Sequence, residues 1–171
     1  MVGSKLKHHF IKKKIDKLSK NLSMKGYGAS QKINSVAIIT LDDSSKQHDF
    51  QEILIQKLQL RNPRIYSYRK FAKEDEKSYK HFSEKDFDWK GQIIEPSLQS
   101  FLEEPFDLLI CFFSKKNQFL EYAAIKSSAT FKIGFSGINS SLFDIELASD
   151  ISQVDVFFNE VKKYLKILNK L

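Results

Sequence analysis

Cysteine, proline, glycine and tryptophan are all scarce in this chain of 171 residues, which contains one, three, six and one of them respectively. The single cysteine, Cys111, excludes an intramolecular disulfide, and the apolar stretch FDLLICFF around it predicts a buried, unreactive thiol. No apolar run approaches the roughly 20 residues of a membrane-spanning helix. The basic start of the chain also lacks the apolar centre of a secretory signal, so we expect a protein of the bacterial cytoplasm.

Glycine-rich phosphate motifs are missing as well, because neither G-x-G-x-x-G nor G-x-x-x-x-G-K-[ST] occurs. The first apolar run leads into LDDSSKQHD, which has no glycine to let the backbone approach a pyrophosphate. Gly134 interrupts an apolar run, which indicates close packing or a bulge, and Gly137 indicates a turn. The four histidines are scattered and have no cysteine partner, so we expect neither a metal nor a cofactor.

Acidic residues are almost absent from the first part of the chain. Residues 1–32 contain nine lysines and one acid, Asp16, a net charge of +8, whereas the other 139 residues carry 19 basic and 20 acidic side chains. We therefore expect two parts, a basic arm over residues 1–30 and a nearly neutral body over residues 31–171. A cationic arm on a neutral body indicates an anionic partner for the arm.

The arm itself has the pattern of a helix over residues 4–23, since Ile11, Ile15, Leu18 and Leu22 follow a 4-3-4 spacing. One interpretation is that this apolar stripe docks on the body and the lysines are merely solvated. The other is that the arm binds RNA, a ribosome or an anionic membrane surface, the membrane being the weaker case. The lysines that would make this contact are Lys5, Lys7, Lys12, Lys13, Lys14, Lys17 and Lys20.

Beyond a linker at 25–30, apolar runs alternate with helical patterns. Strands are predicted at 35–41, 64–71, 106–114, 130–137 and 142–149, and helices at 49–60, 95–104, 116–129 and 150–171. Residues 42–49 and 72–93 are expected to be irregular. Strands that are apolar on both faces and alternate with helices predict an α/β fold. The expected architecture is a Rossmann-like three-layer sandwich with a mostly parallel sheet, preceded by the basic helix.

A ligand of such a fold binds at the carboxyl ends of the strands. The loops expected there offer two carboxylates, two ammonium groups and several polar side chains, contributed by Asp42, Asp43, Ser44, Lys115, Lys116, Ser136 and Asn139. They are compatible with a phosphorylated small molecule or a magnesium ion, and equally with the ordinary polarity of loops.

Aromatic and basic residues are interleaved before Trp89, a pattern that can stack the bases of single-stranded nucleic acid. Six acids between residues 74 and 88 would repel phosphate. We therefore expect Trp89 and its neighbours to fold back as a small aromatic cluster under a long loop.

The segments HHFIKKKIDKL, SVAIITLDD, DFDWKG, FDLLICFFSKKNQFLEYAAIKSSATFKIGF and FDIELAS together resemble an uncharacterised family of short α/β proteins from Bacteroidota. FDLLI, the helix after it and FKIGF are also similar to the N-terminal Rossmann-like half of heptosyltransferase-like glycosyltransferases. That family has a Gly-Asp pair after the first strand, where Leu41 and Asp42 stand in this chain. This second resemblance implies at most a half-fold retained for binding a nucleotide sugar.

Two functions follow from the sequence. The first is a non-catalytic adaptor whose lysine-rich arm contacts RNA or a ribosome. The second is a binder of, or an enzyme acting on, a phosphorylated or nucleotide-sugar ligand at the strand ends. The sequence leaves the oligomeric state open.

Overall fold

The computed structural model describes residues 2–22, 32–73 and 80–171. The linker expected at 25–30, and with it the expected boundary between arm and body, lies outside the described residues.

Six strands form a single parallel sheet in the order β3-β2-β1-β4-β5-β6. Their bounds are β1 (Val36–Leu41), β2 (Arg64–Tyr68), β3 (His81–Phe82), β4 (Leu108–Phe112), β5 (Phe131–Phe135) and β6 (Ile145–Leu147). The order reverses between β1 and β4, which are hydrogen-bonded neighbours. This is the strand order of a Rossmann-like sheet, and it confirms the predicted fold class.

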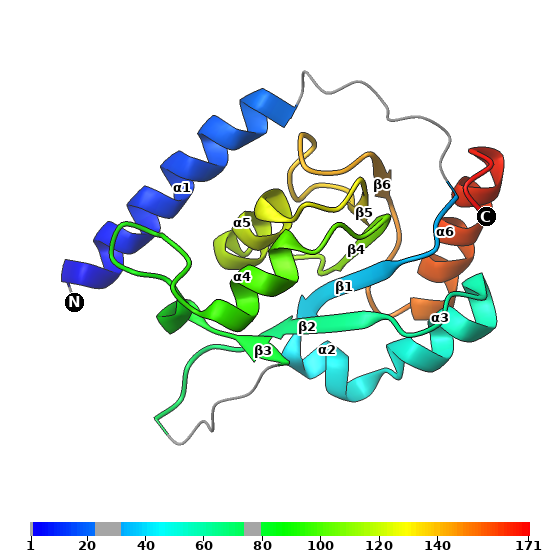
Figure 1. Cartoon of the computed structure of the whole chain (residues 1–171), viewed down its shortest axis with the longest axis horizontal. Coiled ribbons are helices and arrows are strands. Elements are labelled where there is room, and N and C mark those ends of the chain that lie inside the picture. Colours follow the sequence, from blue (N-terminus) through cyan, green and yellow to red (C-terminus); the bar gives the residue numbers. More distant parts are fainter. Residues whose placement is uncertain (1, 23–31, 74–79) are drawn as a thin grey trace.

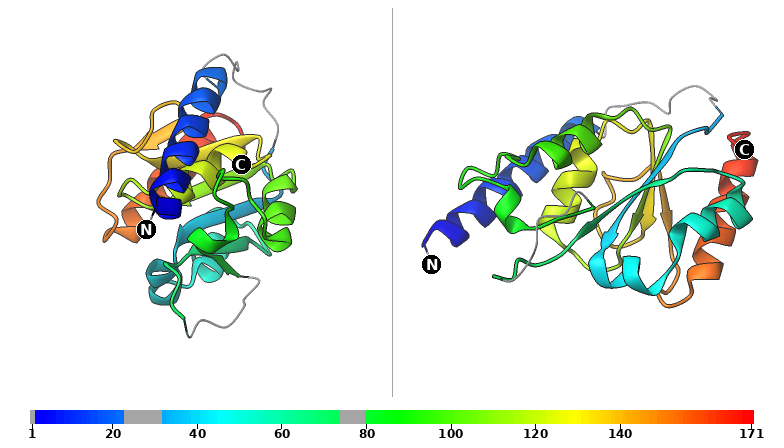
Figure 2. Two further views of the ribbon diagram at one scale, coloured as in Figure 1. Left: turned by 90° about the vertical axis from the view of Figure 1, so that its left-hand side faces the viewer. Right: turned by 60° about the horizontal axis from the view of Figure 1, so that its bottom comes forward.

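Helices cover both faces of the sheet (Figures 1 and 2). One face carries α3 (Phe50–Leu58) and α6 (Val154–Ile167), and the other carries α4 (Pro96–Glu103) and α5 (Gln118–Lys126). The N-terminal helix α1 (Val2–Leu22) lies outside α5, at the left of Figure 1. Two short elements, α2 (Asp42–Gln47) and the 3-10 helix η1 (Glu84–Asp86), complete the described fold.

Aromatic side chains fill the core on both faces. Below α3 and α6 the ring of Phe112 contacts three others, with centroid distances of 5.1 Å to Phe50, 5.3 Å to Phe135 and 5.2 Å to Phe157. On the opposite face of the sheet, the ring centroids of Tyr66 and Phe101 lie 4.9 Å apart. Every residue of β4 is buried, and burial raises the pKa of the Cys111 thiol to about 12, as expected for an unreactive cysteine.

The structure corrects the sequence prediction at three places. Residues 42–47 form α2 directly after β1, where a loop was predicted; two acids in the first turn and Lys46 in the last suit the helix dipole. The two-residue strand β3 lies within the stretch predicted to be irregular. The closing helix begins at Val154, because Asp150 instead accepts a hydrogen bond from the backbone N–H of Ser152 at 2.8 Å in the preceding turn.

Gly134 is the fourth residue of β5, where an aromatic ring covers its backbone. A Cβ atom at this position would lie 2.3 Å from Cζ of Phe143. Gly137, by contrast, has φ +82 and no atom within 4 Å of a hypothetical Cβ. The first glycine therefore serves packing and the second serves a turn, as their sequence contexts indicated.

We expect Gly134→Ala to lower the free energy of unfolding by about 1–3 kcal/mol, since the added methyl group overpacks the strand against Phe143. Urea denaturation measures the change. The penalty should shrink when the same substitution is made in a Phe143→Leu background, as a double-mutant cycle would show. If Gly134→Ala lowers the free energy of unfolding equally in both backgrounds, the contact with Phe143 is not the cause of the loss.

Candidate functional site

The N-terminal helix α1 is docked on the body through its apolar stripe. Ile11 is fully buried and Ile15 nearly so, and Leu18 and Leu22 pack, partly buried, against the same core. The helix runs along α5 (Figures 1 and 2). The 4-3-4 spacing seen in the sequence thus marks a docking face, as in the first of the two interpretations of the arm.

A turn at Gly91 receives this helix. Gly91 has φ +68, and a Cβ atom on it would lie 2.6 Å from Cγ1 of Ile11. The Lys14 ammonium donates a hydrogen bond to the Gly91 carbonyl at 2.9 Å, and the Lys7 ammonium donates to the Glu84 carbonyl at 2.7 Å. Desolvation lowers the pKa of Lys14. Two of the seven candidate lysines therefore hold α1 on the body.

The other five candidate lysines face solvent. Within the described parts of the chain they make no hydrogen bond or ion pair; they are Lys5, Lys12, Lys13, Lys17 and Lys20. The only acid among them is Asp16, which is also exposed. Lys13, Lys17 and Lys20 consequently give the docked helix a basic outer face, whereas Lys12 lies on the flank that lines the cavity described below.

Trp89 lies beside this face and is 54% exposed. Its ring meets that of Phe10 from α1 edge to face at a centroid distance of 5.9 Å, and the Lys90 ammonium lies 4.9 Å from its centroid. The expected aromatic cluster forms only in part. Phe82 and Phe87 are buried in the core, but Trp89 remains at the surface.

The described acids near Trp89 are engaged with the protein. The Asp88 carboxylate accepts a hydrogen bond from the Gln92 N–H at 2.7 Å, and that of Asp86 accepts one from the Ser83 N–H at 2.6 Å. The Glu84 carboxylate accepts hydrogen bonds from the Tyr68 hydroxyl and the Phe71 N–H. These contacts hold the carboxylates on the loop and the adjacent strand, and Asp88 in addition acts electrostatically on Lys14 of α1.

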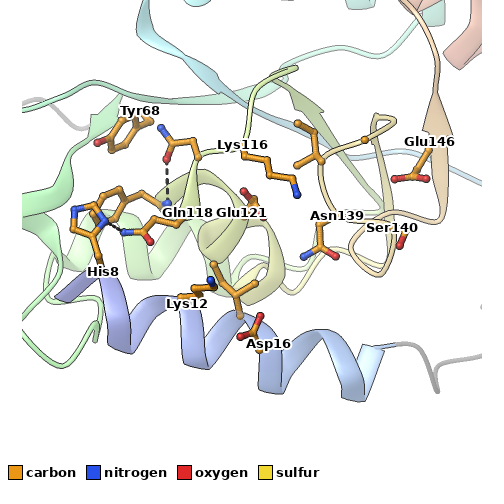
Figure 3. Close-up of a pocket in the computed structure, with 15 residues that line it drawn as sticks. His8, Lys12, Asp16, Tyr68, Lys116, Gln118, Glu121, Asn139, Ser140 and Glu146 are labelled. Atoms are coloured by element: carbon orange, nitrogen blue, oxygen red, sulfur yellow. Dashed lines mark hydrogen bonds between the residues drawn. The ribbon is translucent and has the colours of Figure 1, made fainter. Parts of the chain in front are cut away.

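On its other flank α1 forms one wall of a cavity of about 930 Å³. The remaining walls come from the β4–α5 loop, the start of α5 and the β5–β6 loop (Figure 3). The Asn139 amide donates a hydrogen bond to the Ser19 hydroxyl at 3.3 Å, and His8 is hydrogen-bonded to Gln118. The wall formed by α1 is therefore joined to the rest of the cavity at both ends. The cavity lies at the carboxyl ends of the parallel strands, where ligands of such sheets bind.

The structure brings two of the seven predicted ligand contacts, Lys116 and Asn139, into the lining of this cavity. Lys115 and Ser136 are exposed on the same loops but do not line it. Asp43 and Ser44 belong to α2 and do not line it either.

Asp42 points toward β2 instead. Its carboxylate lies 2.7 Å from the Lys46 ammonium, 3.4 Å from the Ser67 hydroxyl and 3.8 Å from the Arg69 guanidinium. Although desolvation opposes the charge, Lys46 and Arg69 lower the pKa of this carboxyl. With two acids in the first turn of α2, the end of β1 repels phosphate, unlike a dinucleotide-binding turn.

Most residues of the cavity lining were not among the predicted ligand contacts, and Glu121 is the most deeply buried charged residue among them. It is only 8% exposed although it is charged, and it lies in the first turn of α5. Desolvation raises its pKa, and the neighbouring Lys116 ammonium acts in the opposite direction. Its context, FLEYAAI, looks like an amphipathic helix in which Glu121 is the one charged residue, so only the three-dimensional arrangement identifies it.

The described residues contain neither a cluster of metal ligands nor a helix that could span a membrane. In residues 2–22, 32–73 and 80–171, no three acidic, histidine or cysteine side chains are grouped as metal ligands would be. No helix in these ranges has the length and apolar character required to cross a bilayer.

A parallel sheet in the order β3-β2-β1-β4-β5-β6, with a polar cavity at its carboxyl edge and a basic helix forming one wall, defines a Rossmann-like α/β protein. A family model described as "Family of unknown function (DUF6913)" matches residues 7–168, and the chain belongs to this family. No curated protein and no solved structure matches the chain.

The buried Glu121 gives a stability prediction. Because its pKa is raised in the folded state, folding binds protons, and the free energy of unfolding falls as pH rises through this raised pKa. Glu121→Gln removes the buried charge. We expect its melting temperature at neutral pH to rise by about 2–4 °C, the shift that about 1 kcal/mol produces at this size.

Differential scanning fluorimetry from acidic to neutral pH measures this gain, which should vanish at low pH. Glu103→Gln, at an exposed position of α4, is the matched control and should leave the melting temperature unchanged. A lower melting temperature for Glu121→Gln at every pH would show that the carboxylate stabilises the fold.

Proposed function

We propose that this protein is a cytoplasmic, non-catalytic adaptor that binds single-stranded RNA through the outer face of α1 and the Phe10–Trp89 pair. The observation that carries the proposal is an exposed tryptophan, held edge-on by a residue of the basic helix. An exposed ring next to unpaired ammonium groups combines the two features that single-strand binding requires, a stacking surface for bases and cations for phosphates.

Helical spacing places the cations beside the rings. Lys13 and Lys17 follow Phe10 by three and seven residues, so they lie on the same side of α1 as Phe10. Lys90 approaches Trp89 from the loop. A strand whose base stacks on Trp89 therefore has ammonium groups on both sides for its phosphates.

RNA is favoured over a membrane surface because α1 has no apolar face to insert. Its stripe, centred on Ile11 and Ile15, is buried against the body. Leu6, at 43% exposed, and Trp89 offer little area for the interface, so vesicle binding would require α1 to undock. Binding to RNA needs only the surface that is already exposed.

The test is fluorescence anisotropy of a labelled single-stranded oligonucleotide over a series of salt concentrations. Lys13→Gln/Lys17→Gln should weaken binding and reduce the slope of log K against log salt by about 0.7 per lysine. Lys162→Gln/Lys166→Gln, on α6 at the far side of the molecule, changes the net charge equally and should leave binding intact (Figure 1).

Trp89 provides a second readout, since it is the only tryptophan of the chain. Stacking should quench its fluorescence on titration with RNA, and Trp89→Ala should cost about 1–3 kcal/mol of binding free energy. An unquenched signal, equal losses in both double variants, or binding to anionic vesicles in place of RNA would refute the proposal.

A further inference from the structure

The cavity on the inner flank of α1 carries charges of both signs (Figure 3). Lys12 from α1 and Lys116 from the β4–α5 loop enter its lining from opposite walls, and the part of the chain that the structure describes offers neither ammonium a hydrogen bond or ion pair. By contrast, Lys7 and Lys14 of α1 donate hydrogen bonds to backbone carbonyl groups. Two ammonium groups without a direct hydrogen-bond partner at one cavity favour an anionic ligand, in addition to the electrostatic interaction of Lys116 with the Glu121 carboxylate.

Hydrogen-bond acceptors surround this pair of lysines. Glu121 lies between the walls in Figure 3, and Asn139, Ser140 and Glu146 line the end of the cavity away from Tyr68. Their carboxylate, amide and hydroxyl oxygens accept hydrogen bonds from neutral O–H groups. The cavity volume of about 930 Å³ is ample for a molecule with several such groups.

We propose that this cavity binds a phosphorylated, polyhydroxylated small molecule of the sugar-phosphate class. Its phosphate lies between Lys12 and Lys116, and its hydroxyl groups donate to Glu121 and to the side chains at the Asn139 end. This site is independent of the RNA-binding face, since it lies on the opposite flank of α1.

The mixed charge decides between ligand classes. A ligand bearing only negative charge, such as a polyphosphate, would face the carboxylates of Asp16, Glu121 and Glu146. A ligand with an ammonium group at Glu121 would face Lys116, which already interacts electrostatically with that carboxylate. A hydroxyl group is a neutral donor and meets neither repulsion.

Side chains rather than a helix N-terminus provide the phosphate contacts. The backbone N–H groups of Phe119 and Leu120, at the start of α5, donate hydrogen bonds to the Asn117 side chain at 3.0 and 3.2 Å. They have no intrahelical acceptor, and this side chain takes the place of a ligand. The lack of a glycine-rich motif in the sequence is therefore consistent with a phosphate site, because this site does not use backbone amides.

Isothermal titration calorimetry of the full chain tests the assignment with glucose 1-phosphate as the probe. Three control ligands are titrated in parallel. Glucose lacks the phosphate, and inorganic phosphate lacks the sugar hydroxyl groups. Phosphoethanolamine also lacks the sugar hydroxyl groups but carries an ammonium group. We expect measurable binding of glucose 1-phosphate and at least tenfold weaker binding of the other three, roughly one lost charged contact.

Variants distinguish this cavity from any other lysine-rich surface. Lys116→Gln should weaken glucose 1-phosphate binding about tenfold or more, whereas Lys115→Gln, its neighbour outside the lining, should leave it unchanged. Both positions are exposed, so both variants are expected to melt at the wild-type temperature.

Three results would overturn the proposal: no binding of glucose 1-phosphate by the wild-type chain, equal weakening in both lysine variants, or tighter binding of phosphoethanolamine. The Lys13→Gln/Lys17→Gln variant should bind glucose 1-phosphate normally, so failure of RNA binding and failure of this site are separate outcomes.

Discussion

The contact between Ile11 and the turn at Gly91 is the constraint on which the rest of the structure depends. It fixes α1 so closely that a single methyl group on Gly91 would collide with Ile11 at 2.6 Å. Hydrogen bonds from Lys7 and Lys14 close over the same contact. A helix with seven lysines and one acid thereby becomes a fixed part of the α/β body.

Once α1 is docked, its periodicity assigns a separate role to each side. Lys7, Phe10 and Lys14 meet the loop that carries Trp89, and Lys13, Lys17 and Lys20 face solvent. The opposite flank places His8 and Lys12 on the cavity. One helix therefore builds both proposed binding surfaces, which explains how a lysine-rich segment can be neither a free tail nor a purely structural element.

Much of the fold could be predicted from hydrophobic periodicity, because buried parallel strands such as FDLLICFF are apolar on both faces. The candidate site was harder to predict from the sequence. Lys116 and Asn139 could be predicted because they follow strands, whereas Glu121 looked like a polar residue of a helix. Its burial and the contact between α5 and α1, for example that of Gln118 with His8 across 110 residues of sequence, are properties of the tertiary structure. Likewise, the exposure of Trp89 beside Phe10 of α1 depends on a contact between distant parts of the chain, which no local pattern records.

Native-state amide hydrogen exchange along α1 tests the central claim most directly. Most of the stability of a helix in a protein comes from the packing of its apolar face, so a free arm would exchange with little protection. The docked structure predicts that the amides of Ile11, Ile15 and Leu18 are protected as strongly as those of α5, on which α1 packs. Rapid exchange at these three positions, with α5 still protected, would contradict it.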